Sequence, residues 1–196
     1  MKKIKKLTAI FLALLMILSA VPSAGLGLAL KASALSSSGT LSSTVSYTFD
    51  ASTGTLTITG SGDMPDYSGG YLSAKSPFKG CAEIKHLVIE AGVTGIGSAA
   101  FYGCTGIGYV KIPNTVKNIG EKAFSSCTGI RDISIPYGVT SIGNYAFSGC
   151  SDMSTIMIPS NATSIGIYAF QNCSALGLVV TDDGDVDRVK GMMREA

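Results

Sequence analysis

Apolar residues recur in a fixed order along much of the chain, and the segment from 116 to 136 shows the pattern most clearly. Its eight apolar positions are Val116, Ile119, Ala123, Phe124, Cys127, Ile130, Ile133 and Ile135. The step from Ile119 to Ala123 and Phe124 is typical of a helical turn, because residues about four apart share a face. The two-residue step from Ile133 to Ile135 predicts a strand with one buried face.

The same unit begins again at Val93 and Val139, more weakly at Ala162, and in degenerate form near Phe78. One position in every copy is a cysteine, and neighbouring cysteines are always 23 residues apart: Cys81, Cys104, Cys127, Cys150 and Cys173. A constant period of this length is typical of a solenoid, in which one unit is repeated and stacked. The sequence therefore predicts an α/β repeat fold of about five 23-residue coils over residues 78–181.

Each coil is predicted to contain one short strand, a tight bend, and a short helical or 3₁₀ turn on the opposite side. The glycines that follow isoleucine fall at the bends, where we expect unusual φ values: Gly97, Gly120, Gly143 and Gly166. Pro113, Pro136 and Pro159 should end the strands, because proline cannot donate a hydrogen bond to a ladder. Strands stacked about 4.8 Å apart would form a parallel sheet with one buried and one open face.

Both ends of such a stack expose apolar surface and need caps. Alternating apolar residues on both sides of the turn at 50–54 predict an N-terminal β-hairpin cap over residues 44–59, followed by a loop over 60–76. The cap and loop together would occupy residues 35–77. A capping tail over 182–196 would contain a short helix with Asp183 or Asp185 as its N-cap and with one apolar face: Val186, Val189, Met192 and Met193.

Residues 1–34 are typical of a secretion signal: four lysines precede an apolar run from Leu7 to Val21, and Ala32-Ser33-Ala34 offers small residues for cleavage. The apolar stretch is also long enough to remain as a membrane anchor of about 20 residues, so both fates stay open. Removing this segment leaves ten Lys and Arg against thirteen Asp and Glu, a formal charge of −3 (10 − 13). An acidic chain is not expected to bind nucleic acid.

The cysteine column raises the question of disulfides, which export favours. Equivalent residues in stacked coils lie about 4.8 Å apart, whereas the Cβ atoms of a disulfide lie about 3.8 Å apart. Five cysteines also cannot all pair within one chain. We therefore expect a column of buried free thiols that pack as small apolar residues.

Residues that could support catalysis or bind a metal are few. His86 is the single histidine, and it precedes the inward-facing Leu87, so it should face solvent. One histidine without a Cys-x-x-Cys pair supplies too few ligands for zinc. The four aspartates between Asp182 and Asp187 suggest calcium, but their spacing departs from the calcium-loop pattern, and we interpret them as a solvated turn. No enzymatic activity, cofactor or metal is predicted.

The unit Ile-Gly-x-x-Ala-Phe-x-x-Cys-x-x-Ile-x-x-Ile-x-Ile-Pro at 119–136 recurs at 142–159, with Met153 in place of the central isoleucine. It resembles the BspA-like leucine-rich repeat, also called the Treponema pallidum type, over about residues 78–181. Residues 54–67 also resemble the stretch that often precedes these repeats in secreted bacterial members. The resemblance implies a leucine-rich-repeat solenoid in a secreted or surface-displayed bacterial protein, and adhesion to host matrix proteins such as fibronectin and fibrinogen.

The exposed strand face is the predicted binding surface, because it mixes apolar, aromatic and charged residues as protein-binding surfaces do. Its outward-facing residues are His86, Val88, Tyr109, Lys111, Asp132, Ser134, Thr155 and Met157, and Leu178 and Val180 would extend the row. We expect an exported, non-enzymatic, adhesin-like protein whose partner is a host extracellular-matrix protein or another bacterial surface protein. The alternative is a structural spacer of the cell envelope, held in the membrane by an uncleaved N-terminal segment.

Overall fold

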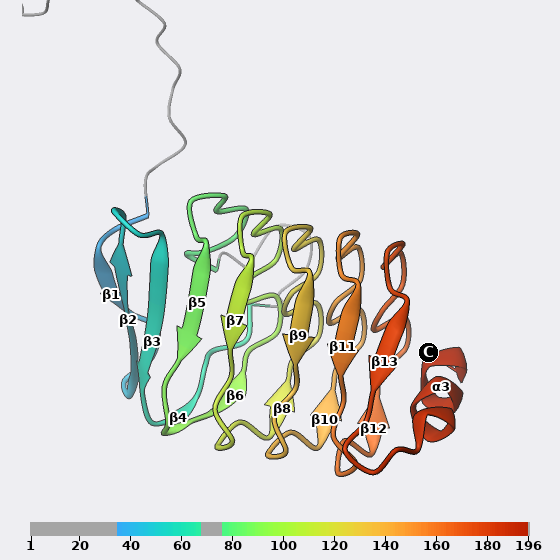
Figure 1. Ribbon diagram of the computed structural model, residues 1–196. Helices are drawn as coiled ribbons and strands as arrows, with labels where there is room; N and C mark the ends of the chain where they lie inside the picture. Colours follow the sequence, from blue (N-terminus) through green and yellow to red (C-terminus); the bar gives the residue numbers. More distant parts are fainter. Residues whose placement is uncertain (1–34, 68–75, 196) are drawn as a thin grey trace, which may run out of the picture. The chain divides into compact units, whose positions relative to one another are not determined.

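The computed structural model describes residues 35–67 and 76–195, with no side-chain description for 188 and 192–195. The segment interpreted as a secretion signal, residues 1–34, lies outside the described residues, as do residues 68–75 of the expected loop. The described residues form stacked coils whose strands lie side by side in chain order (Figure 1).

The strands of the exposed face begin every 23 residues: β5 (His86–Ile89), β7 (Tyr109–Lys111), β9 (Asp132–Ser134), β11 (Thr155–Met157) and β13 (Leu178–Val180). Parallel pairing places equivalent residues opposite one another, for example His86 opposite Tyr109 and Asp132 opposite Thr155. The predicted solenoid of 23-residue coils is therefore confirmed. The row is interrupted once: no ladder joins β7 to β9, so β5 and β7 belong to one sheet and β9, β11 and β13 to another.

A second parallel sheet forms the next side of each coil. Its strands are β4 (Gly62–Asp63), β6 (Val93–Ile96), β8 (Asn118–Ile119), β10 (Ser141–Ile142) and β12 (Ser164–Ile165). The turns that follow use two sets of hydrogen bonds in alternation. The Ala123 N–H donates to the Gly120 carbonyl within the turn, a 3₁₀-type bond. The neighbouring Phe124 N–H donates to the Ala146 carbonyl of the next coil, at 2.8 Å. No continuous helix forms here, because every second N–H is used between coils.

The N-terminal end of the stack consists of β1 (Ser38–Thr40), β2 (Val45–Asp50) and β3 (Thr55–Gly60). β2 and β3 form the antiparallel hairpin that the alternating pattern indicates, and β1 pairs with β2 at the outer edge. β3 also pairs in parallel with β5, so the hairpin continues the sheet into the first coil. β4 lies within the segment interpreted as a loop, where the pattern was too short to predict a strand.

At the other end, α3 (Val186–Glu195) follows the acidic turn. The Asp183 carboxylate accepts a hydrogen bond from the Asp185 N–H at 3.1 Å. Val189 is fully buried, and α3 contacts β12 of the last coil. Within residues 35–67 and 76–195, no helix combines the length and the apolar character needed to cross a bilayer.

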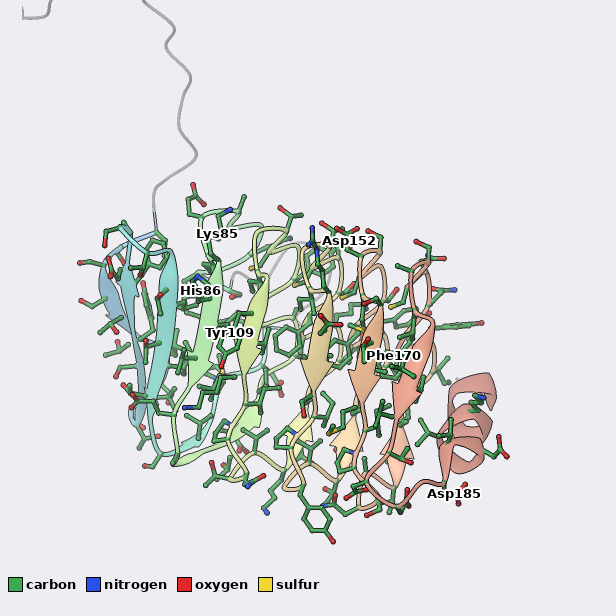
Figure 2. All side chains as sticks on the ribbon, viewed as in Figure 1. Lys85, His86, Tyr109, Asp152, Phe170 and Asp185 are labelled. Atoms are coloured by element: carbon green, nitrogen blue, oxygen red, sulfur yellow. The ribbon has the colours of Figure 1, made fainter. Side chains whose placement is uncertain are left out.

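A stack of phenylalanine rings runs through the core. Phe78, Phe101, Phe124 and Phe147 are fully buried, and Phe170, labelled in Figure 2, continues the stack in the last coil. Neighbouring ring centroids are 5.3–5.5 Å apart, and neighbouring ring planes differ by 2–20°. Buried aromatic side chains contribute large apolar areas and additional ring–ring attraction.

The glycines that follow isoleucine do not adopt the unusual φ values that the sequence suggested. The positive φ values occur two residues later, at Ala99, Lys122, Tyr145 and Tyr168, with φ of 55–58°. A Cβ atom on Gly120 would instead lie 2.6 Å from the Ser98 nitrogen and 2.8 Å from the Gly97 carbonyl carbon. Glycine is needed at this position because the backbones of neighbouring coils approach closely there.

All five cysteines are free thiols, and those at the two ends of the column, Cys81 and Cys173, are half-buried. Each interior thiol also has a polar role that the sequence did not reveal. The Sγ–H of Cys104 donates to the Phe78 carbonyl at 2.9 Å, and that of Cys127 donates to the Phe101 carbonyl at 3.0 Å. The thiols thus give a second donor to buried carbonyls that already accept a main-chain N–H from within their own turn.

Alkaline pH should destabilise the fold through these thiols. Burial away from water raises the pKa of Cys104 from its ordinary value of 9.0 to about 12, and that of Cys173 to about 11. Above pH 9 the unfolded chain therefore loses protons that the folded chain keeps, and the free energy of unfolding falls. The expected slope is about 1.4 kcal/mol per pH unit for each such thiol. Urea unfolding at a series of pH values from about 8 to about 10.5 measures this slope, because that range spans the ordinary thiol pKa of 9.0 and stays below the raised value.

The control for this pH experiment is Cys104→Ala, which should give a shallower alkaline slope than the parent chain because it has one buried thiol fewer. An unfolding free energy that stays level through the alkaline range in the parent chain would contradict the prediction.

Candidate functional site

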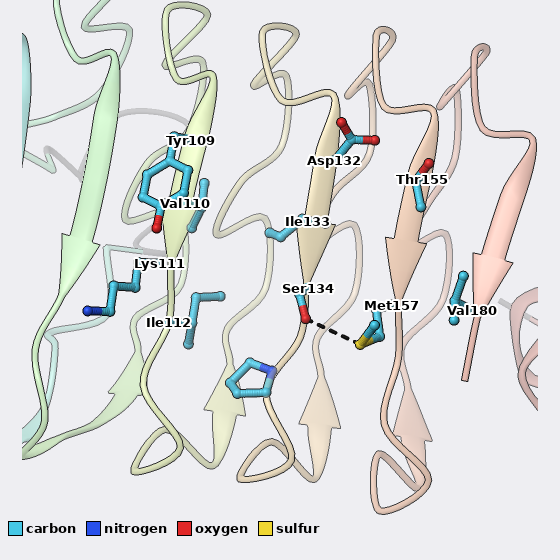
Figure 3. Close-up of a pocket in the computed structure, with 11 residues that line it drawn as sticks. Tyr109, Val110, Lys111, Ile112, Asp132, Ile133, Ser134, Thr155, Met157 and Val180 are labelled. Atoms are coloured by element: carbon cyan, nitrogen blue, oxygen red, sulfur yellow. Dashed lines mark hydrogen bonds between the residues drawn. The ribbon is translucent and has the colours of Figure 1, made fainter. Parts of the chain in front are cut away.

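A groove lies on the strand face where the ladder between β7 and β9 is interrupted (Figure 3). We call it the strand-face groove, and its volume is about 520 Å³. It is lined by Tyr109, Val110, Lys111, Ile112, Asp132, Ile133, Ser134, Pro136, Thr155, Met157 and Val180. Because β7 and β9 share no ladder, side chains between them that would otherwise face the core become accessible from the open face.

Val110 shows this effect most directly. Its equivalents in the neighbouring coils, Leu87 and Ile133, are 0% and 4% exposed, whereas Val110 is half-buried. Ile112 and Ile133, the inward-facing residues beside it, also line the strand-face groove. The floor of the groove is therefore apolar, and burying it against a partner would be favourable by about 25 cal/mol per Å².

The rim carries one charge of each sign on opposite strands. Tyr109, which is 51% exposed, and Lys111 stand on β7, while Asp132 and Ser134 stand on β9 (Figure 3). An ammonium group on one wall and a carboxylate on the other favour a partner with complementary charges in a defined orientation.

Neighbouring coils hold several of these side chains in place. The Ser154 hydroxyl donates to Asp132 Oδ1 at 3.1 Å, and the Ser134 hydroxyl donates to Met157 Sδ at 3.4 Å. On the other side, the ring of His86 lies 6.1 Å from the ring of Tyr109, centroid to centroid, and Figure 2 shows both on the strand face.

Six of the eight residues expected on the binding face line the strand-face groove: Tyr109, Lys111, Asp132, Ser134, Thr155 and Met157. His86 and Val88 stand on β5, outside it. Sequence reasoning missed the apolar floor, because Val110, Ile112 and Ile133 occupy inward-facing positions. The sequence carries no signal for the interruption, because the column Leu87, Val110, Ile133, Ile156 and Val179 has a second valine where the ladder is intact.

The remaining polar residues do not form a metal site in the described part of the chain. No group of three or more His, Cys, Asp or Glu side chains lies close enough together to bind a metal ion there. In the acidic turn, Asp182 accepts hydrogen bonds from the Ser160 N–H at 2.6 Å and the Ser160 hydroxyl at 3.3 Å. These bonds tie the C-terminal tail to the preceding coil.

Residues 74–187 match the family model described as the BspA type leucine rich repeat region, in six copies. The match covers more than half of the chain, so the chain belongs to this family. Leucine-rich repeats of this kind generally mediate protein–protein interaction and are generally non-enzymatic scaffolds, and BspA-like proteins are typically bacterial surface proteins. No curated protein matches the chain.

Solved bacterial proteins have the same fold. A leucine-rich repeat protein from Eubacterium ventriosum is 26% identical and aligns over 76% of this chain with a TM-score of 0.58. A leucine rich cell surface protein from Faecalibacterium prausnitzii is 25% identical over 80% of this chain with a TM-score of 0.57. The T. pallidum leucine rich repeat protein is 26% identical over 68% of this chain, and 66% of its own length, with a TM-score of 0.52. The chain spans 44% and 42% of the first two proteins.

Proposed function

We propose that this chain is an exported, non-enzymatic, adhesin-like bacterial surface protein that binds a protein partner through the strand-face groove. The observation that carries the proposal is the interrupted ladder between β7 and β9, which opens an apolar floor in a sheet that otherwise presents only alternating outward side chains. Grooves with an apolar floor and a few placed polar groups are the usual form of a binding site.

Export is supported by the basic and apolar residues of the N-terminal segment, which are typical of a secretion signal. The relative from Faecalibacterium prausnitzii, which is itself a cell surface protein, supports display at the cell surface. The acidic balance of residues 35–196, at −3 (10 − 13), supports a protein partner over a nucleic acid.

The groove also suggests the chemistry of the partner. Its floor accommodates an apolar side chain, and Lys111 and Asp132 on opposite walls would pair with an acidic and a basic residue on either side of that side chain. An exposed segment of a matrix protein such as fibronectin or fibrinogen, or of another bacterial surface protein, fits this description.

Replacing Tyr109 and Lys111 together by alanine should weaken binding to immobilised fibronectin or fibrinogen about tenfold or more, because aromatic and charged groups at the centre of an interface dominate its affinity. Binding is measured by biolayer interferometry on the chain recovered from the medium of a bacterial host. Mass spectrometry of the same material reads the N-terminal residue and so tests export and cleavage of the N-terminal segment. Tyr109 and Lys111 are both exposed, so the fold should be unaffected.

The matched control is Tyr137→Ala, which removes a 62% exposed tyrosine outside the groove and should leave the affinity unchanged. Equal binding by the parent and the groove variant would rule out this face. Absence of binding to both matrix proteins would rule out the matrix-adhesin role, and a chain found only in the membrane fraction with its N-terminal segment intact would rule out release from the cell.

A further inference from the structure

The turns opposite the strand face are joined by main-chain hydrogen bonds that all run in the same direction. In three successive coils, three alternate N–H groups donate to three alternate carbonyls of the next coil toward the C-terminus. The last such set joins Tyr145 to Ile167 at 3.0 Å, Phe147 to Ala169 at 2.8 Å and Gly149 to Gln171 at 2.7 Å. The sets that start at Ala99 and Lys122 have the same spacing.

The last coil has the same donors without a coil to accept from them. The N–H groups of Tyr168, Phe170 and Asn172 occupy the positions of Tyr145, Phe147 and Gly149, and they have no acceptor in the part of the chain that the structure describes. Tyr168 and Asn172 also have positive φ values of 58° and 60°, as the equivalent residues of the interior coils do. We call these three groups the terminal donor row.

Apolar side chains surround the terminal donor row. Phe170 is half-buried, whereas Phe147, one coil earlier, is fully buried, and Tyr168 is 44% exposed. Cys173 and Leu176 are likewise half-buried. α3 lies beside β12 and buries Val189, so it covers this end of the stack in part (Figure 1).

The two ends of the stack differ in a way that argues against head-to-tail association of copies. At the N-terminal end the phenylalanine stack is covered by the hairpin, because the Tyr47 ring packs edge-on against Phe78 with ring centroids 4.9 Å apart. The Phe78 ring of a second copy is therefore not available to stack on Phe170. The occupant that fits the terminal donor row is therefore a different polypeptide segment.

We propose that the terminal donor row binds an extended segment of a partner protein, which adds to the end of the solenoid through its main chain. The segment would present carbonyls at alternate residues to Tyr168, Phe170 and Asn172, and an aromatic side chain between them that stacks on Phe170 as Phe170 stacks on Phe147, at about 5.5 Å. Main-chain pairing supplies affinity and the side-chain contact supplies specificity, as in the addition of a strand to a sheet edge.

The probe is a synthetic peptide of residues 141–150 carrying Cys150→Ser, because this segment holds the carbonyls and the ring in the required order. Amide hydrogen exchange is followed by NMR in the full chain. Without peptide, the amides of the terminal donor row should exchange much faster than those of Tyr145, Phe147 and Gly149. Peptide at about ten times its dissociation constant should slow exchange of these three amides about tenfold.

Two controls make the result specific. A peptide that also carries Phe147→Asp should give no slowing, because the charge cannot stack on Phe170. In the full chain, Tyr168→Gly should weaken peptide binding about fivefold or more, because it removes the exposed ring. The φ value of 58° at Tyr168 suits glycine, so the backbone should keep its conformation. Tyr137→Ala should leave peptide binding unchanged.

The proposal is wrong if the three amides are already as protected as those of the interior coils, or if both peptides slow them equally or not at all. It is also wrong if protection appears without peptide and rises with protein concentration, because the occupant is then a second copy of the chain. None of these outcomes depends on the strand-face groove, so this test is independent of the proposed function.

Discussion

Phe124→Ala should lower the free energy of unfolding by about 4 kcal/mol. Phe124 is fully buried, and its ring centroid lies 5.3 Å from that of Phe101 on one side and 5.3 Å from that of Phe147 on the other. Truncation removes the transfer free energy of the ring and both stacking contacts. The neighbouring rings cannot close the cavity, because the main-chain bonds between coils hold them apart, so little of the loss is recovered.

Urea unfolding followed by circular dichroism measures the change. The matched control is Phe170→Ala at the same position of the last coil, where the ring is half-buried and stacks on Phe147 on one side. This control should lose less than half as much. Equal losses in the two variants would show that ring burial within the stack does not determine the stability of the solenoid.

Gly120→Ala should be the next most damaging change, with a loss of about 3 kcal/mol, at the upper end of the range for overpacking. The added Cβ would lie 2.6 Å from the Ser98 nitrogen, 2.8 Å from the Gly97 carbonyl carbon and 2.9 Å from the Ile96 oxygen. All three are backbone atoms, which cannot move away as a flexible side chain can. The two coils would have to separate locally, and the Gly120 N–H bond to the Ile96 carbonyl would lengthen from 2.8 Å.

Gly108→Ala is the control for this experiment. The nearest atom to a Cβ at Gly108 is the Gly129 oxygen at 3.9 Å, an ordinary contact, and Gly108 does not have a positive φ value. We expect a change within about 0.5 kcal/mol for this variant, as for other surface substitutions. If chemical denaturation gives the same free energy for Gly120→Ala and for the parent chain, close approach of the coils is not the reason for glycine at this position.

Much of the architecture follows from the pattern of apolar residues. A period of 23 residues, with a cysteine and a phenylalanine in every copy and an apolar pair two residues apart, such as Ile133 and Ile135, in four of the five, is compatible with stacked coils in register. Strand geometry then places alternate side chains on opposite faces, which is why the outward positions of Tyr109, Lys111, Asp132 and Ser134 could be predicted. The family follows from the same residues, because the match extends over 74–187.

The details that create surfaces could not be predicted in this way, because they depend on contacts between residues 22–26 positions apart in the chain. The exposure of Val110 depends on the spacing of two strands in different coils, and periodicity predicts the same spacing everywhere. The reason for glycine at Gly120 depends on how closely two backbones approach. The thiol of Cys127 was expected to be simply apolar, and its bond to Phe101 appears only when the coils are stacked.

The sequence by itself determined that this chain is a solenoid of stacked coils, which side chains point outward, and the family to which it belongs. Only the tertiary structure decided where the sheet opens into a groove and which main-chain donors at the end of the stack have no acceptor among the described residues. The physical reason is that periodicity reports what is equivalent in every coil, whereas a binding surface arises where one coil differs from the next.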